Sequence, residues 1–253
     1  MSASGIVNRL KSTGSPQKAK LLSGFFKTGK GQYGEGDVFL GVIVPEQRKI
    51  AKEFRELPFP EIEKLLASPY HEARLTGLLI LTYAFEKADE RKRESIYDFL
   101  LDHRVAMNNW DLVDAIVPKI VGEYMSTHRN ERKILRIFSE SDNLWERRIA
   151  VLATAAFIRR GQFKDTLSIC TTLLRDEHDL IHKATGWMLR EVGKRDEAVL
   201  RDFLDVHAFR MPRTMLRYAI ERLPEEERKG YLNMPRIRPS CRGFSANGRR
   251  GGR

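Results

Sequence analysis

Hydrophobic side chains recur at helical spacing along most of the chain. In the stretch AMNNWDLVDAIVPKIVG, at residues 106–122, one face of a helix would carry Leu112, Val113, Ile116, Val117 and Ile120. The longest strand-like alternation is GDVFLGVIV, inside a glycine-containing connection that ends where Pro45 opens the next helix. The pattern therefore predicts an all-α domain.

Similar helices recur at a regular interval. The predicted helix starts, roughly 34 to 38 residues apart, fall near His71, Asn109, Asn143, Asp179 and Arg213. Each follows another helical segment, such as RESIYDFLLDH, so the repeat is a helical hairpin. Such hairpins stack into a superhelical solenoid in which one helix of each pair lines the concave side. We expect an N-terminal extension with helix-forming potential at 1–15, the repeat domain at 16–232 and a disordered tail at 233–253.

Composition narrows the class of protein. The chain has 253 residues, of which 42% are hydrophobic, and contains no run of about 20 apolar residues that would cross a membrane. We therefore expect a soluble, cytoplasmic protein without a membrane partner. Its two cysteines, Cys170 and Cys241, support neither a disulfide framework nor a cysteine metal site, and the histidines show no HExxH or comparable cluster. No metal and no other cofactor is expected.

The charge suggests an acidic partner. Forty-five Lys and Arg against thirty-four Asp and Glu give a formal charge of +11. A charge of this size is typical of a protein with a nucleic-acid-binding surface. Part of the excess lies in the tail PRIRPSCRGFSANGRRGGR, which is either a nucleic-acid-binding tail or a solubilising terminus. The body remains basic without it.

One carboxylate is out of place in this pattern. Asp111 is explained by the first turn of a helix after an asparagine cap, where a negative charge complements the helix dipole. Asp114 lies a turn deeper, beside Trp110, and a carboxylate there is costly unless a cation meets it. The identity of that cation is the question the sequence raises.

Two later helices carry cations in related positions. Counted from the helix starts, Asp114 and Arg148 are both five residues in, and Trp187 is eight residues in, on the same face. Arg148 either bridges to a neighbouring carboxylate or clamps a phosphate. Lys183, Trp187 and Arg190 form a stripe at i, i+4 and i+7, which suits a charged backbone beside a flat group, although a tryptophan at this spacing is also typical of a core.

The segments NNWDLVDAIVPKIVG, SDNLWERRIAVLA and IHKATGWMLRE, in this order and spacing, resemble the AlkD family of alkylpurine DNA glycosylases. The resemblance extends from AKLLSGFFKTGKGQ to about Leu232. It implies a solenoid of HEAT-like repeats and an active cleft containing Trp110, Asp114 and Trp187, with Asp114 as the catalytic acid. It also implies Arg148 at the DNA backbone.

The resemblance further implies a substrate, alkylated duplex DNA, from which N3- or N7-alkylated purines are released by hydrolysis of the N-glycosidic bond. The family's aromatic residue near the N-terminus would fall at Phe25 or Phe26, where some relatives carry tyrosine. We expect DNA contacts from Lys183 and Arg190 as well, a monomeric enzyme, and association with the nucleoid through DNA.

The chemistry agrees with this interpretation. An N3- or N7-alkylated purine is already cationic and leaves without protonation, while positive charge develops on the deoxyribose. An ionised Asp114 and the faces of Trp110 and Trp187 would stabilise that charge. The alternative function is a non-catalytic helical-repeat scaffold that binds nucleic acid or acidic proteins, in which Asp114 merely pairs with an arginine.

Overall fold

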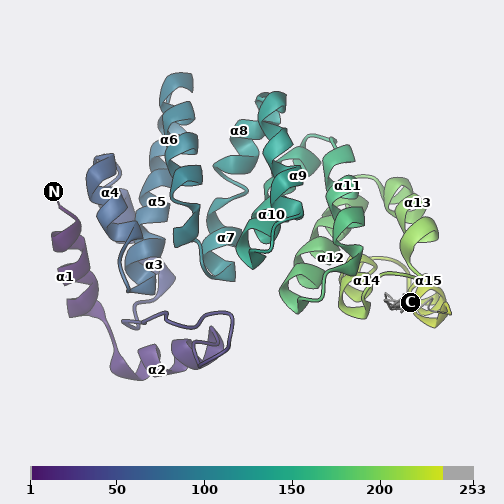
Figure 1. Cartoon of the computed structure of the whole chain (residues 1–253), viewed down its shortest axis with the longest axis horizontal. Coiled ribbons are helices and arrows are strands. Elements are labelled where there is room, and N and C mark those ends of the chain that lie inside the picture. The colour runs from purple at the N-terminus through teal and green to yellow at the C-terminus, as the bar shows by residue number, and fades with distance from the viewer. Residues whose placement is uncertain (1, 236–253) are drawn as a thin grey trace, which may run out of the picture.

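The computed structural model describes residues 2–235 and is all-α over that range (Figure 1). The first helices are α1 Ala3–Thr13, α2 Pro16–Phe25, α3 Val44–Glu53, α4 Phe59–Leu66, α5 His71–Lys87 and α6 Glu90–Asp102. Next come η1 Arg104–Ala106, α7 Trp110–Ile116, α8 Val121–Thr127, η2 Arg129–Arg132, α9 Lys133–Ser139 and α10 Leu144–Arg159. The last are α11 Lys164–Thr172, η3 Leu173–Arg175, α12 Asp179–Gly193, α13 Glu197–His207, α14 Arg213–Ala219 and α15 Glu225–Asn233.

The five predicted helix starts are confirmed. Helices α5, α12 and α14 begin at their predicted residues, and α7 and α10 begin one residue after the predicted asparagines. Those asparagines are N-caps: the side-chain oxygen of Asn109 accepts from the Trp110 backbone N at 2.9 Å, and that of Asn143 accepts from the Trp145 N at 2.8 Å. Each cap satisfies a backbone donor that the first turn leaves without a partner.

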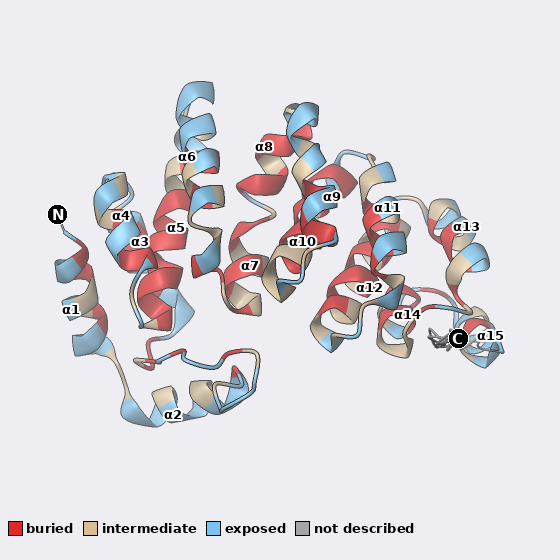
Figure 2. Cartoon of the chain, viewed as in Figure 1, coloured by how far each residue is buried: buried red, intermediate tan, exposed pale blue. Residues whose placement is uncertain are grey.

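The hairpins stack side by side into a curved row, which confirms the predicted solenoid (Figure 1). Helix α10 packs against α8, α9 and α12, and α12 packs in turn against α13 and α14. Figure 2 shows α5, α10 and α12 largely buried within the row, whereas α6 and α13 keep one face exposed. The core therefore runs along the row and connects neighbouring repeats.

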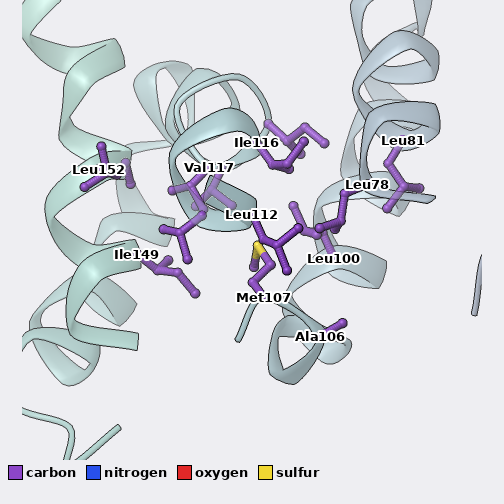
Figure 3. Packing of buried hydrophobic residues seen from close by; sticks show 14 of the residues in the cluster. Leu78, Leu81, Leu100, Ala106, Met107, Leu112, Ile116, Val117, Ile149 and Leu152 are labelled. Atoms are coloured by element: carbon purple, nitrogen blue, oxygen red, sulfur yellow. The ribbon is translucent and has the colours of Figure 1, made fainter. Parts of the chain in front are cut away.

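Helix α7 is held between its neighbours by its apolar face. Figure 3 shows Leu112 of α7 and Val117, which directly follows α7, between Leu78 of α5 on one side and Ile149 of α10 on the other. All four side chains are fully buried. Because this face is fixed in the core, the orientation of the remaining face of α7, which carries Trp110 and Asp114, is fixed as well.

The N-terminal residues divide into two parts. Helix α1 lies within the predicted extension, but Ile6 and Leu10 are fully buried and the helix packs against α4 and α5. Helix α2 has no buried residue and lies outside the row (Figure 1). The segment after it contains the strand-like GDVFLGVIV, which forms only an isolated bridge between Val38 and Tyr70. It is anchored where the Glu72 carboxylate accepts from backbone N–H groups of residues 40–42.

Two remaining sequence predictions concern the core and the tail. Cys170 is a buried free thiol, whereas Cys241 and most of the predicted 233–253 tail lie outside the described residues.

The glycine of the GWMLR motif allows two helices to pack closely. A Cβ at Gly186 would lie 2.5 Å from the backbone O of Met215, so α12 and α14 approach closely there. Among the described helices none is long and apolar enough to span a membrane.

Candidate active site

The concave side of the row contains a cavity of about 370 Å³ that gathers most of the predicted site residues. Its lining residues are Phe25, Tyr33, Trp110, Asp114, Arg148, Leu180, Lys183, Trp187 and Tyr218. They come from α2, the segment after α2, and four successive inner helices, α7, α10, α12 and α14. The equal spacing of the repeats therefore brings residues separated by more than a hundred positions to one surface.

Asp114 meets its cation in Arg148. The Nε and Nη2 of Arg148 donate to Oδ1 and Oδ2 of Asp114, both at 2.7 Å, which is a bidentate pair. Burial raises the pKa of Asp114 above the ordinary aspartate value, and the guanidinium opposes that rise. The carboxylate thus stays next to the cavity with only one charged donor, and each oxygen keeps a further lone pair for another group.

Arg148 itself is buried. Its residue is only 4% exposed, and its Nη1 donates to the backbone O of Leu180 at the start of α12. Of the two roles weighed for Arg148, this geometry is that of a bridge to a carboxylate. Contact with a DNA phosphate remains a prediction. Such a contact would have to use the two guanidinium N–H groups that do not take part in these bonds.

Trp110 lies on a stack of aromatic rings. Its indole stacks on Phe26, with ring centroids 5.3 Å apart and 24° between planes, and Phe26 is buried. Phe25 is 62% exposed and meets Trp110 edge-on at 6.0 Å. The two phenylalanines predicted near DNA therefore occupy different positions: Phe25 lines the cavity, and Phe26 supports Trp110 from behind.

The predicted stripe on α12 divides in a similar way. Trp187 and Lys183 line the cavity, and the Lys183 Nζ lies 2.7 Å from the Asp179 carboxylate in an exposed pair. Arg190 is not among the lining residues, and its guanidinium donates to Glu221. A DNA contact by Arg190 remains a prediction that would require this pair to open.

Three lining residues escaped the sequence analysis. Tyr218 is five residues into its helix counted from Arg213, the same phase as Asp114 and Arg148, so the repeat period contained the signal. Tyr33 lies in the irregular segment after α2, and Leu180 contributes its backbone oxygen, for which no sequence pattern exists. Tyr33 and Tyr218 bring to the cavity the phenolic hydroxyls that Phe25 and Phe26 lack.

The cavity combines a carboxylate with its paired guanidinium, two indoles, two phenols, a phenylalanine ring and a lysine. Indole faces and a carboxylate attract a cation, and a lysine at the rim attracts an anion such as a phosphate. Within residues 2–235 no group of His, Cys, Asp or Glu side chains is arranged to hold a metal ion. The arrangement suits a ligand with a cationic centre beside an anionic backbone.

The chain belongs to the family of DNA alkylation repair enzymes, whose family model matches residues 6–223. Among solved structures, it is similar to a predicted DNA alkylation repair enzyme from Enterococcus faecalis, with 19% identity and a TM-score of 0.67 over 84% of this chain and 98% of that one. It is also similar to AlkD2 from Streptococcus mutans, with 16% identity and a TM-score of 0.52 over 81% and 97% of the two chains. No curated protein matches.

These comparisons confirm the family and the fold that the sequence predicts. They support a role in DNA repair and a DNA substrate, and the structural likenesses, at these identities, concern the fold alone.

Proposed function

We propose that this protein is a DNA glycosylase that hydrolyses the N-glycosidic bond of cationic N3- and N7-alkylated purines in duplex DNA. The observation that carries the proposal is the Asp114 carboxylate, held bidentately by Arg148 at the edge of a cavity that Trp110 and Trp187 also line. The family match supports the DNA substrate. The reaction and the lesion class are those that the resemblance to the AlkD family implies, and the chemistry of the cavity agrees with them.

The chemistry follows from where charge moves. The alkylated purine carries a positive charge and becomes neutral as its bond to the sugar breaks, so no proton donor is needed. The deoxyribose gains that charge, and a fixed carboxylate close to it lowers the energy of the transition state. The free lone pairs of Asp114 can also orient the attacking water, while the faces of the two indoles attract the same cation.

Arg148 has a positioning role in this proposal. Its two hydrogen bonds fix the orientation of the Asp114 carboxylate before the substrate binds, so the carboxylate does not have to be ordered during the reaction. Lys183 is suited to a phosphate because an exposed ion pair such as that with Asp179 is worth only about 0–1 kcal/mol and exchanges readily. The overall charge of +11 attracts the DNA backbone over longer distance.

The rival function, a binding scaffold without catalysis, has one observation in its favour. The pair between Asp114 and Arg148 satisfies the carboxylate without any substrate, as a purely structural pair would. The two functions differ in turnover. A scaffold binds DNA and releases no base, whereas a glycosylase of this kind releases cationic alkylpurines and leaves uracil and 8-oxoguanine in place.

The deciding experiment is single-turnover release of 7-methylguanine from duplex DNA by the wild type and by Asp114→Asn. We expect release by the wild type and a rate roughly a hundred- to thousandfold lower in the variant, the usual cost of removing a preorganised charged group. DNA affinity should stay within about twofold, since binding rests on basic residues elsewhere.

Asp165→Asn is the matched control. Asp165 accepts from Arg132 at 2.8 Å, so it also pairs with an arginine, but it lies outside the cavity and its loss should leave the rate unchanged. Equal release by wild type and Asp114→Asn would remove the catalytic role. No release by either protein, with tight DNA binding, would favour the scaffold.

A further inference from the structure

A buried charged cluster lies directly behind Trp110, outside the cavity. His71 of α5 is 2% exposed and places both ring nitrogens against carboxylates: Nδ1 is 2.9 Å from Oδ2 of Asp37, and Nε2 is 2.9 Å from Oδ2 of Asp111. Asp37 belongs to the segment after α2, and Asp111 to the first turn of α7. One imidazole thus joins three parts of the chain.

The surroundings define the charge of this ring. A neutral imidazole has one donor and one acceptor nitrogen, so facing two carboxylates it would set a lone pair against one of them. Asp37 is favoured as an anion, because its two oxygens receive hydrogen bonds from the Arg74 guanidinium, Asn108 and Asn109. Asp111 presents its Oδ2 to Nε2 from the first turn of α7, where the helix dipole complements a carboxylate. Both ring nitrogens therefore donate, and His71 is an imidazolium.

The ring also supports Trp110 through Phe26. Phe39 stacks on His71 at 4.5 Å, and Phe26 lies 5.2 Å from His71 on one side and 5.3 Å from Trp110 on the other. A cation within about 6 Å of an aromatic ring is attracted to it. His71 therefore acts on the Trp110 region by two routes, the Phe26 ring and the neighbouring residue Asp111.

We propose that His71 is a positioning residue: its imidazolium, held between Asp37 and Asp111, fixes the indole of Trp110 at the reaction cavity. The inference rests on the proposed function only for its effect on rate. The charge of His71 and its coupling to Trp110 belong to the folded protein with or without substrate.

Other charged groups near the ring set its response to pH. Asp37 and Asp111 face it directly, Arg74 approaches through Asp37, and the neighbouring Glu72 is engaged by the backbone of residues 40–42. The two carboxylates raise the pKa of His71 above its ordinary value of 6.5 although burial acts in the opposite direction. The imidazolium should therefore persist to a higher pH than that of an ordinary histidine.

The first test needs no substrate. Nitrogen-15 NMR of the histidine rings over a pH series should show both His71 nitrogens protonated at pH 7, and the indole N–H signal of Trp110 should shift with the same midpoint. That signal is assigned by its absence in Trp110→Phe. In His71→Gln the pH-dependent shift of the Trp110 signal should vanish, because a glutamine amide does not titrate.

The second test is single-turnover release of 7-methylguanine by His71→Gln, Asp111→Asn and the control His128→Gln. His128 faces Glu90 at 3.1 Å on another part of the surface. We expect a roughly tenfold lower rate for the first two, as for a small misplacement of a reacting group, with DNA affinity unchanged and the control at the wild-type rate. The rates of the variants and the wild type are compared at the same pH, so that titration of the substrate affects all of them equally.

The outcomes separate the two proposals. A wild type that releases no base removes the proposed function, while the NMR series still decides the role of His71. A His71 ring with one unprotonated nitrogen at pH 7, or a Trp110 signal that titrates unchanged in His71→Gln, overturns the positioning role. If His71→Gln does not fold, the release rate of Asp111→Asn and the NMR pH series of the wild type still test the positioning role.

Discussion

Two carboxylates, the buried Asp37 and the half-buried Asp114, each pair with a buried arginine but have opposite properties. Asp37, beside Arg74, accepts four hydrogen bonds, and these donors lower the pKa of its carboxyl despite its burial. Among residues 2–235, Asp114 accepts hydrogen bonds from Arg148 alone, and burial keeps its pKa above the ordinary value. The number of donors thus separates a carboxylate that holds the fold together from one left available to a substrate.

The strongest way to break this comparison is the same isosteric change at both positions. Asp37→Asn leaves Arg74 buried without a counter-charge and removes one of the two carboxylates that face His71, so we expect a loss of about 3–5 kcal/mol in the free energy of unfolding. Asp114→Asn also takes the counter-charge from buried Arg148, but it should cost less, because burial raises the pKa of Asp114 and its ionised form therefore adds less to stability. Urea denaturation of both variants at pH 7 measures the difference, and equal losses would contradict the assignment.

The pKa shifts of Asp37 and His71 predict opposite responses of the protein's stability to pH. The lowered pKa of Asp37 adds stability above the ordinary aspartate value of 3.8, which is lost as the pH falls through the lowered pKa. The raised pKa of His71 adds stability below 6.5, which is lost as the pH rises through the raised pKa. In the proposed mechanism activity needs ionised Asp114, so the acid limb of the reaction should lie at a higher pH than an ordinary aspartate would give.

Arg148→Gln sharpens that prediction. Because Arg148 lowers the pKa of Asp114, its removal should move the acid limb of 7-methylguanine release to still higher pH, after subtraction of uncatalysed release. Arg132→Gln, which opens a similar pair with Asp165 outside the cavity, should leave the profile in place. An acid limb at the same pH in wild type and Arg148→Gln would show that another group controls it.

The fold and part of the site were predictable because their signals are local or periodic. Apolar spacing and the caps Asn109 and Asn143 define helices within a few residues of sequence. The repeat period then places Asp114 and Arg148 in the same phase, and the motif that resembles the family adds Trp187. Each of these inferences needs only the chain near the residue or a constant interval.

The path of the segment after α2 was not predictable. Asp37 reaches Asn109 across 72 positions, through hydrogen bonds that follow from no pattern in the sequence. The choice between two roles for Arg148 likewise depended on how α7 and α10 are set against each other, which fixes the bidentate pair across 34 positions. The resemblance placed Phe26 near DNA together with Phe25, and only the packing of this segment shows that Phe26 supports Trp110.

The smallest expected effect extends the comparison to an exposed pair. Lys183 and Asp179 have side chains 42% and 56% exposed, so Lys183→Gln should change the free energy of unfolding by less than about 1 kcal/mol. If Lys183 binds a phosphate, the dependence of DNA affinity on salt, plotted as logarithms, should become shallower by about one unit. Lys229→Gln, which removes an exposed pair with Glu225 on α15, should leave that slope unchanged. An unchanged slope for Lys183→Gln would place the phosphate contact on other basic residues, whereas a shallower one would show that the weakest of the three pairs is the one that opens for DNA.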